Sequence, residues 1–445
     1  MAVVPDGAEL SDLVRGGPVG VAEIELTDGL ATLRDTVGPP REGRVLLVLA
    51  RLHSHPIACL TLADDAEDPE ITWPRAARTA LVGALDRHLR ADGLKLGALD
   101  LWAGGAELVD PPCLDERRRT LESAPGVTVI IGTRDRSDRL DACLKTVLAL
   151  DYPAFDVLVV DNDPTTSDTA ELVAARGAAT GKIAYLREDR RGLGAAHNCG
   201  LAAASGTIVA FTDDDVAVDR YWLSELVAPF VTNTRVAGAS GLILPAALET
   251  PAQRLLEAHG RFGKGFEARL FDLGPNRPDD ALFPFAAGRL GSGANMAFDA
   301  AWLRDSGGFD AALGVGTPAR GGDDLLALFR LVTSGRTLAY CPSALVWHYH
   351  HCDSAAVPRQ VFGYGVGLGA YLASAVAHEP RVLAKMAYRA PAGLAYLRTG
   401  IRPNWWPRSL MRLELRGLLY GPLAYAVSRV ARRDKPTRRF ASSAP

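Results

Sequence analysis

The chain has 445 residues, 48% of them hydrophobic and 23% charged, so it is long enough for two or three globular domains that each bury a core. A formal net charge of -3, with no basic stripe before the C-terminal end, argues against nucleic acid as a partner. The six cysteines are scattered and form no CxxC pair, which favours free thiols in a reducing compartment over disulfides or a zinc site.

Residues 1–120 are predicted to form a small α+β module of unknown role. The first residues contain neither a basic nor an apolar segment, so we expect no secretory signal and a cytoplasmic protein. Apolar runs at 44–49 and 57–62 predict two strands. The helix that follows is predicted to have Pro74 near its first turn and to stop at Gly93.

His53 and His55 lie in the HSHP turn between these two predicted strands. Imidazoles are common metal ligands. On a hairpin turn, without further ligands close in sequence, histidines are more often exposed to solvent. We therefore expect both side chains to face water.

From Val127 onward, alternating apolar runs and helical patterns predict an α/β domain whose mostly parallel sheet is covered by helices. The predicted strands are 127–131, 157–160, 183–186 and 208–211. The last of them is an uninterrupted apolar run, which is typical of a strand buried on both faces of a sheet.

The strand at 208–211 ends in three consecutive carboxylates, Asp213, Asp214 and Asp215. Adjacent carboxylates repel one another, so this cluster needs a cation from elsewhere. Open α/β sheets bind ligands at the carboxyl ends of their strands, and the first two predicted strands also end in polar residues. A solvated acidic turn does not explain why several polar strand ends share one edge of the sheet.

Later segments add further candidates. Gly192 and Gly194 permit a tight turn before a helix of small residues, which is a weak signal by itself. The stretch 291–298 is rich in small residues that let a backbone approach a ligand closely. Asp323 and Asp324 begin a predicted helix, where acids are also favourable with the helix dipole alone.

Together the motifs VTVIIGTRDR, VLVVDNDP, GLGAAHNCGLAAASG, FTDDD and GGDDLLALFRL resemble those of the family 2 glycosyltransferases. That family consists of inverting enzymes with the GT-A fold that use nucleotide-sugar donors. The resemblance covers about residues 126–352 and implies a Rossmann-like, mixed but mostly parallel sheet there. Residues 1–120 and 353–445 lie outside it.

The resemblance implies roles for individual residues. Asp324 matches the catalytic aspartate, but Asp323 stands beside it where a glutamate is common, so both acids remain candidates for the general base. Asp161 matches an acid that hydrogen-bonds the base of the donor nucleotide, which favours a UDP- or dTDP-sugar. The residues implied in donor binding are Thr133, Arg134, Arg136, Asp161, Asn162, Arg191, Asn198, Asp214 and Asn295.

The resemblance also implies a divalent metal ion, Mn²⁺ or Mg²⁺. Asp213 and Asp215 match the metal-associated acids of the DxD motif, and His348 matches a histidine that completes the site in several relatives, with His350 and His351 as competitors. A cation held by carboxylates neutralises the departing diphosphate. An aspartate takes the proton of the attacking hydroxyl, and a single displacement inverts the anomeric carbon. The acceptor, whether a glycan, a glycolipid or a small-molecule product, is not identified.

Two other functions share part of this pattern. A metal-dependent nucleotidyltransferase also holds Mg²⁺ with acids on an α/β sheet, but the GTRDR loop lacks the glycine-rich, lysine-containing sequence that such an enzyme needs. A catalytically inactive nucleotide-sugar- or carbohydrate-binding module predicts loss of the metal acids or the base, yet Asp213, Asp215 and Asp324 are all present. Glycosyl transfer is therefore the leading hypothesis.

Residues 353–445 are predicted to be helical. Val361–Ala377 carries no charge over 17 residues, slightly fewer than the roughly 20 that span a bilayer. A later apolar segment contains Arg412, Arg416 and Arg429, and the chain ends in a basic run. This pattern suits helices that lie on another surface, so we expect helix packing, a homo-oligomer or peripheral contact with the inner face of the cell membrane.

Overall fold

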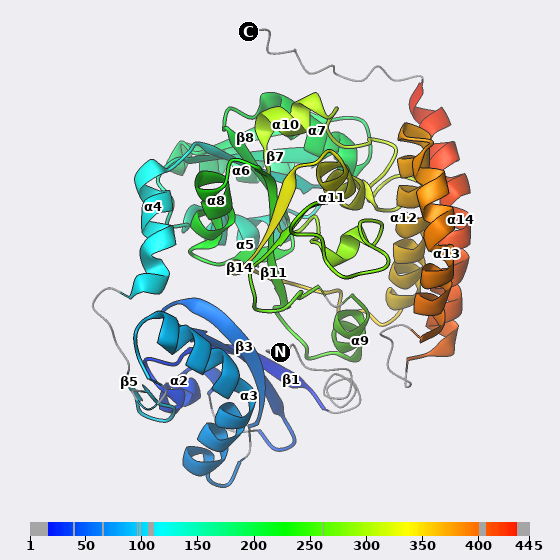
Figure 1. The fold of residues 1–445 in the computed structure, drawn as a ribbon. Coiled ribbons are helices and arrows are strands. Elements are labelled where there is room, and N and C mark those ends of the chain that lie inside the picture. The colour runs from blue at the N-terminus through cyan, green and yellow to red at the C-terminus, as the bar shows by residue number, and fades with distance from the viewer. Residues whose placement is uncertain are drawn as a thin grey trace.

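The structure is a computed structural model that describes residues 17–38, 41–64, 66–95, 97, 99–105, 111–260, 262–399 and 406–433. Figure 1 shows a small N-terminal sheet covered by a helix, a large sheet with helices packed around it, and the long C-terminal helices along one side. Most of the basic run predicted at the chain end lies outside the described residues.

The N-terminal sheet has the strand order β1-β2-β3, with β1 (Val19–Glu25) parallel to β2 (Val45–Leu52) and β3 (His55–Ala63) antiparallel to β2. The two predicted strands correspond to β2 and β3. Strand β1 was not predicted, because VGVAEIE mixes apolar and acidic residues. Short elements complete this part of the chain: α2 (Leu33–Val37), β4 (Leu99–Asp100) and β5 (Gly104–Gly105).

Helix α3 (Pro69–Ala91) covers this sheet. The Asp68 carboxylate caps it by accepting a hydrogen bond from the Ile71 N–H. The helix therefore begins before the predicted start, and Pro74 lies inside it and not near its first turn. Its buried face consists of Trp73, Ala77, Leu81, Leu85 and Leu89.

The large sheet has the strand order β10-β14-β11-β13-β9-β6-β7-β8, and β12 pairs with β14. Strands β9, β6, β7 and β8 pair in parallel, as do β11 and β14, whereas β10, β12 and β13 run antiparallel to their neighbours. The predicted α/β fold with a mixed, mostly parallel sheet is confirmed. The strands are β6 (Val127–Thr133), β7 (Phe155–Asn162), β8 (Ile183–Glu188), β9 (Ile208–Asp213), β10 (Val216–Val218), β11 (Val236–Pro245), β12 (Arg269–Phe271), β13 (Met296–Asp299) and β14 (Thr337–His348).

Both faces of this sheet are buried. Ile130 of β6 packs in one core with Phe298, while its neighbour Val129 packs in the opposite core with Leu144 and Trp222. Successive residues of a strand point to opposite faces, so burial on both sides explains the uninterrupted apolar runs of the sequence. The helices around the sheet are α4 (Asp115–Ser123), α5 (Ser137–Leu148), α6 (Asp168–Thr180), α7 (Leu193–Ala203), α8 (Trp222–Thr232), α9 (Pro251–Gly260), α10 (Ala300–Asp305) and α11 (Asp323–Thr333).

The predicted helical C-terminal region is confirmed, and α12 and α14 lie side by side in it (Figure 1). Glycines let their backbones meet: a Cβ atom at Gly365 would collide with the carbonyl of Glu414, and one at Gly369 with that of Leu418. Of the described helices, α12 alone is long and apolar enough to cross a membrane by length and composition, and 56% of its apolar window is buried inside the structure. The helices are α12 (Val357–His378), α13 (Val382–Thr399) and α14 (Arg408–Arg433).

Helix α12 also supports the start of α11. Gly322 precedes α11 with a φ of 88°, and a Cβ atom there would lie 2.6 Å from the carbonyl oxygen of Gly367. Further along, the rings of Phe329 and Tyr371 meet edge-on, with centroids 6.0 Å apart. The segment that carries the paired aspartates is therefore held by the C-terminal helices.

Candidate functional site

The strand register brings three polar strand ends together. Thr133 at the end of β6 is the Cα partner of Asp161 at the end of β7, and Gly132 is the partner of Asp213 at the end of β9. The Thr133 hydroxyl donates a 2.6 Å hydrogen bond to Oδ2 of Asp214. Residues from separate parts of the sequence thus share one edge of the sheet.

Arg136 supplies a cation to the acidic cluster. Its Nη1 donates to Oδ1 of Asp214 over 3.1 Å and to Oδ2 of Asp215 over 3.3 Å. Burial alone would lower the pKa of Arg136, but the two carboxylates outweigh burial and raise that pKa above its usual value. Asp213 receives no such hydrogen bond, and burial together with the charges of Asp215 and Asp214 raises its pKa well above the usual range. The single charge of Arg136 does not balance the three carboxylates, so a further cation at Asp213 would stabilise the cluster.

Asp213, Asp215 and His348 form a group that fits a divalent ion. One ligand atom from each lies within 4.8 Å of the others, and Nε2 of His348 is 3.5 Å from Oδ1 of Asp215. Nδ1 of His348 is buried without a hydrogen-bond partner among the described residues. His350 instead contacts Glu257, with 2.8 Å between Nε2 and Oε2. His348 is therefore the histidine that faces the acids.

The paired acids of α11 point in different directions. Asp324 accepts hydrogen bonds from the Gly293 N–H over 2.9 Å and from the Leu325 N–H over 2.8 Å. Burial and the charge of Asp323 raise the pKa of Asp324 to about 6. Asp323 is only 4% exposed and faces inward, with Oδ2 3.4 Å from Nδ1 of His197. Asp324 is the more accessible of the two.

The electrostatics connect α11 to the acidic cluster. The charges of Asp324 and Asp323 both contribute to the raised pKa of Asp213, after burial and the two neighbouring aspartates. Since a charge acts strongly only over a short distance, the end of β9 and the start of α11 border the same site.

Asp161 retains an unused acceptor. Its side chain is fully buried, Oδ2 accepts a 3.0 Å hydrogen bond from the Tyr185 hydroxyl, and Oδ1 has no partner among the described residues. Burial raises the pKa of Asp161. An unpartnered buried oxygen is costly, so a ligand N–H at this position would be favourable.

Comparison with known proteins identifies the domain that carries this site. Residues 128–287 match the family model described as "Glycosyl transferase family 2". The chain carries a family 2 glycosyltransferase domain. The match ends before α11 and β14, so Asp323, Asp324 and His348 lie beyond the matched residues.

Two of the relatives that this chain matches are named glycosyltransferases. The chain is 29% identical to the pre-mycofactocin glycosyltransferase of Mycobacterium tuberculosis over 247 aligned residues. The aligned residues make up 55% of this chain and 47% of that protein. It is 35% identical over 107 residues to the glycosyltransferase AglE of Haloferax volcanii, covering 23% of this chain and 35% of the relative. The chain thus spans about half the length of the first relative and less of the second.

Among solved structures, the mannosyltransferase PcManGT of Pyrobaculum calidifontis, in complex with GDP-Man and Mn²⁺, is similar with a TM-score of 0.42 and 18% identity, covering 74% of this chain and 84% of that one. GalNAc-T7 with UDP, GalNAc and Mn²⁺ has a TM-score of 0.40 and 16% identity, covering 66% of this chain and 58% of that one.

Three of the asparagines predicted as donor ligands have side-chain amides that hydrogen-bond the protein itself. Oδ1 of Asn162 accepts from the Gly192 N–H over 2.7 Å. Asn198 both donates to and accepts from the backbone of Phe309, each over 2.8 Å. Asn295 is fully buried and bonds the Trp222 indole and two backbone carbonyls. They position loops around the site.

The two remaining predicted donor ligands lie on loops. Nε of Arg134 donates to the Asp163 carbonyl over 2.9 Å, which ties the loop after β6 to the end of β7. The Arg191 side chain is exposed, and its backbone carbonyl accepts a hydrogen bond from Arg432 of α14. Sequence reasoning missed Tyr185, since a single Tyr carries no motif, and it singled out Gly293 only as part of the small-residue stretch 291–298.

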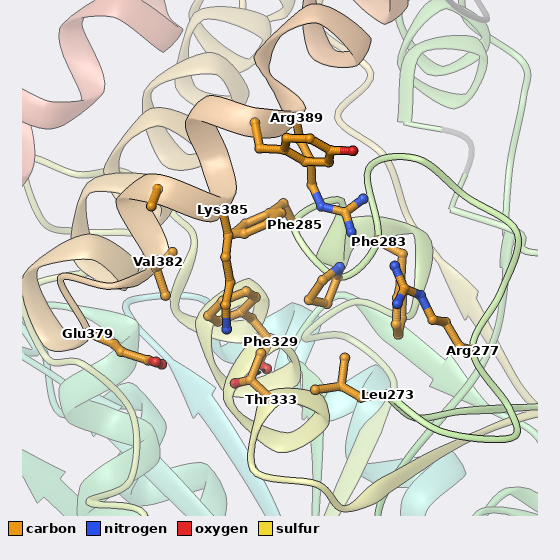
Figure 2. Close-up of a pocket in the computed structure, with 13 residues that line it drawn as sticks. Leu273, Arg277, Phe283, Phe285, Phe329, Thr333, Glu379, Val382, Lys385 and Arg389 are labelled. Atoms are coloured by element: carbon orange, nitrogen blue, oxygen red, sulfur yellow. Dashed lines mark hydrogen bonds between the residues drawn. The ribbon is translucent and has the colours of Figure 1, made fainter.

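A separate cavity lies away from the acidic cluster. A space of about 530 Å³ lies between α13 and the loops around Phe283, and its described lining includes none of the predicted donor, metal or base residues. Figure 2 shows its aromatic walls with the cations of Arg277, Lys385 and Arg389 around them. This cavity is separate from the acidic site.

The prediction that His53 and His55 face solvent is wrong. The His53 side chain is 4% exposed, and its Nδ1 is 2.7 Å from Oδ2 of Asp92. His55 lies between the Ser343 hydroxyl at 2.9 Å and the Cys113 carbonyl at 3.1 Å. The turn faces the segment that leads into the family 2 domain, and for this reason it is covered.

Proposed function

We propose that this protein is a metal-dependent, inverting glycosyltransferase that moves a sugar from a nucleoside-diphosphate sugar to an acceptor hydroxyl. The observation that carries the proposal is the convergence of an under-neutralised acidic cluster with an accessible aspartate at a helix N-terminus. The raised pKa of Asp213, caused by burial and by Asp215 and Asp214, also receives a contribution from Asp324. A diphosphate–metal complex supplies the missing positive charge, and a carboxylate is available to take a proton.

The metal would be held by Asp213, Asp215 and His348. Two carboxylates and one imidazole suit Mn²⁺, and Mg²⁺ prefers oxygen ligands alone. When bound, the ion neutralises the charge that develops on the diphosphate leaving group. Arg136 holds the carboxylates of Asp214 and Asp215 in place through contacts of 3.1 Å and 3.3 Å.

Asp324 would act as the general base. The Gly293 N–H holds Oδ2 over 2.9 Å, and this contact fixes the direction of the carboxylate. With a pKa of about 6, caused first by burial and then by Asp323, the group is ionised at neutral pH and accepts the proton of the acceptor hydroxyl. General-base assistance of this kind is worth about 10² to 10⁴ in rate. Attack from the side opposite the diphosphate inverts the anomeric carbon.

Asp161 would recognise the nucleotide base. Its free Oδ1 can accept the ring N–H of uracil or thymine, which supports a UDP- or dTDP-sugar as donor. Tyr185 holds the other oxygen over 3.0 Å, so the carboxylate is oriented before the nucleotide arrives.

The test is nucleotide binding followed by turnover. Thermal melts with UDP, dTDP and GDP, each with and without Mn²⁺, should show stabilisation that needs both nucleotide and metal and is largest for UDP or dTDP. Hydrolysis of the matching sugar nucleotides should then proceed in the wild type and stop in Asp324→Asn, which still binds donor. Absence of any nucleotide-dependent shift would refute the proposal, and binding without turnover would indicate an inactive binding module.

We also propose that the exposed face of α14 contacts an anionic membrane surface on the cytoplasmic side. Leu419 is 82% exposed and Leu423 is 58% exposed, and the arginines of α14 include the exposed Arg412 and Arg416. Wild-type protein should sediment with phosphatidylglycerol vesicles but not with phosphatidylcholine vesicles, and Leu419→Asp should abolish sedimentation. Ile71→Asp, at a 65% exposed position on α3, is the matched control. Equal recovery with both vesicle types, or dimers in solution, would contradict membrane contact.

A further inference from the structure

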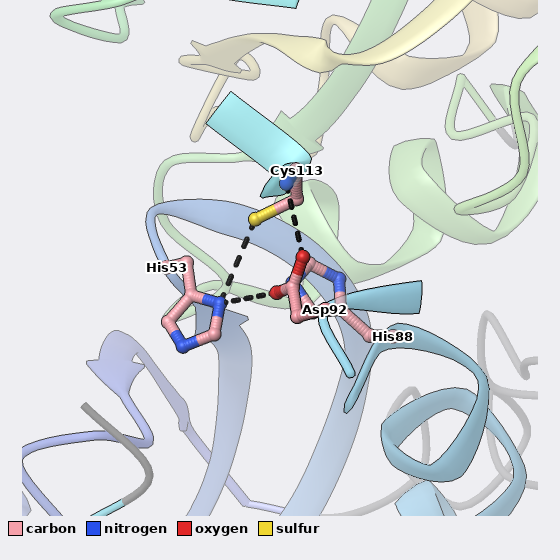
Figure 3. Close-up of side chains that lie close together, drawn as sticks. All are labelled: His53, His88, Asp92 and Cys113. Atoms are coloured by element: carbon pink, nitrogen blue, oxygen red, sulfur yellow. Dashed lines mark hydrogen bonds and ion pairs between the residues drawn. The ribbon is translucent and has the colours of Figure 1, made fainter. Parts of the chain in front are cut away.

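A second group of metal-ligand side chains lies far in sequence from the acidic cluster. It consists of His53 in the turn between β2 and β3, His88 and Asp92 at the end of α3, and Cys113 in a short 3-10 turn, Pro112–Leu114. One ligand atom from each lies within 4.8 Å of all the others. Figure 3 shows the imidazole of His53, the carboxylate of Asp92 and the thiol of Cys113 directed toward one another.

The arrangement differs from a Cys–His–Asp catalytic triad. In a triad, the thiol and the acid bind opposite nitrogens of the imidazole. Here Oδ2 of Asp92 at 2.7 Å and Sγ of Cys113 at 3.6 Å both approach Nδ1 of His53. Three different donor atoms therefore converge on one point, which is the geometry of ligands around a shared ion.

His88 supplies the independent observation. Its Nε2 is buried and has no hydrogen-bond partner among the described residues, although it lies 3.4 Å from Oδ2 of Asp92. A buried imidazole nitrogen without a partner is unfavourable, and a metal ion is a partner that would satisfy it. The same ion would meet the oxygen of Asp92 that already faces His53.

We propose that His53, His88, Asp92 and Cys113 bind one Zn²⁺ ion. Two imidazole nitrogens, one thiolate sulfur and one carboxylate oxygen are the ligand types of tetrahedral zinc sites, whereas Mg²⁺ and Ca²⁺ select oxygen alone. Binding releases the thiol proton to solvent, and the thiolate and carboxylate together balance the charge of the ion. The other oxygen of Asp92 accepts from the Cys113 N–H over 2.9 Å and orients the carboxylate.

The site would be structural, because four protein ligands leave no open position for a substrate. It joins the turn of the N-terminal sheet, the end of α3 and the segment that enters α4. The same turn touches the large sheet through His55, whose Nδ1 lies 2.9 Å from the Ser343 hydroxyl of β14. The ion would therefore stabilise the packing of the N-terminal sheet against the large sheet. Cysteine spacing could not reveal the site, because it uses one cysteine only.

The experiment is metal loading of the full chain, followed by replacement of zinc with Co²⁺. After chelator treatment and dialysis against Zn²⁺ alone, elemental analysis should find one tightly held zinc per chain in the wild type and in Cys352→Ser. Zinc affinity should fall at least about tenfold in Cys113→Ser and His88→Ala. The ligand group Asp213, Asp215 and His348 includes no thiol. The nearby Cys143 donates to the Asp213 carbonyl over 3.4 Å, and burial raises the pKa of its thiol, so we expect a thiolate-to-cobalt charge-transfer band to report on Cys113.

Each outcome decides the proposal. The band should appear in the wild type and in Cys352→Ser, and it should vanish in Cys113→Ser while absorption from cobalt at the acidic cluster persists. If Cys113→Ser does not fold, the test is the charge-transfer band of the cobalt-loaded wild type, which should be lost in His88→Ala. A wild-type protein without the band, or a band that survives in Cys113→Ser, would overturn the assignment.

Discussion

The Thr133 hydroxyl binds Oδ2 of Asp214 over 2.6 Å across a sequence separation of 81 residues. Asp214 is 4% exposed, and burial raises its pKa while Arg136 and Thr133 oppose that effect. Thr133→Val keeps the shape of the side chain and removes the donor, so we expect it to lower the free energy of unfolding by about 1–3 kcal/mol. Urea unfolding followed by circular dichroism measures this change.

Thr180→Val is the matched control for that substitution. The Thr180 hydroxyl donates to the Arg176 carbonyl and accepts a long, 3.4 Å hydrogen bond from the Lys182 N–H. Both contacts are exposed to solvent, so their loss should change stability by no more than about 0.5 kcal/mol. Equal effects of the two substitutions would mean that the contact between Thr133 and Asp214 does not stabilise the strand edge.

The histidine at the end of β14 should be a metal ligand. We expect His348→Ala to weaken Mn²⁺ binding about tenfold or more, because the substitution removes the imidazole from the group that it forms with Asp213 and Asp215. Titration of Mn²⁺ followed by electron paramagnetic resonance gives the affinity. His351→Ala, at an exposed position, should bind Mn²⁺ like the wild type. If His351→Ala loses the ion and His348→Ala keeps it, the two roles are exchanged.

Activity should depend on the protonation of Asp324. Its pKa of about 6 is raised by burial and then by Asp323, and a general base works only when ionised, so kcat/KM should fall as pH drops through about 6. Asp323→Asn removes the second cause and should move this limb of the profile to lower pH. Asp324→Asn should abolish turnover at every pH. If the pH at which kcat/KM falls is the same in Asp323→Asn as in the wild type, the titrating group is not Asp324.

Close helix packing in the C-terminal region should make one glycine irreplaceable. At Gly369 a Cβ atom would overlap the carbonyl of Leu418 in α14, so Gly369→Ala should cost about 1–3 kcal/mol through forced separation of the helices. In Gly393→Ala the nearest atom to the new Cβ lies 4.0 Å away, and the substitution should be neutral or stabilising because alanine favours helix. Thermal denaturation of the two variants compares them directly.

The sheet was predictable because its strands are buried on both faces and therefore form uninterrupted apolar runs. The same runs located Asp161 and Asp213 at strand ends, and parallel pairing then brought those ends together. Strand β1 was not predicted, because its sequence mixes polar and apolar residues and its pairing with β2 is a long-range contact. Pattern alone does not report which distant strand completes a sheet.

Side-chain direction was not predictable from the sequence. Asn198 stands in a glycosyltransferase-like motif, yet an asparagine amide satisfies a backbone segment as well as a ligand, and here it holds Phe309. The burial of His53 likewise depends on Asp92 and Cys113, which reach the turn only through tertiary packing. Contacts of this kind depend on tertiary packing, and the sequence pattern alone does not predict them.

The close fit of Gly322 against Gly367 sets a lower limit on the size of a working enzyme. A protein shortened after Cys352 would lose α12, expose the apolar side of α11 to water and leave Asp324 on an unsupported turn. Under the proposed function, we expect a minimal active version to extend at least through His378. Transplanting only the stretch that resembles its relatives into another protein would carry over the strands proposed to face the nucleotide, without the helix that supports Asp324.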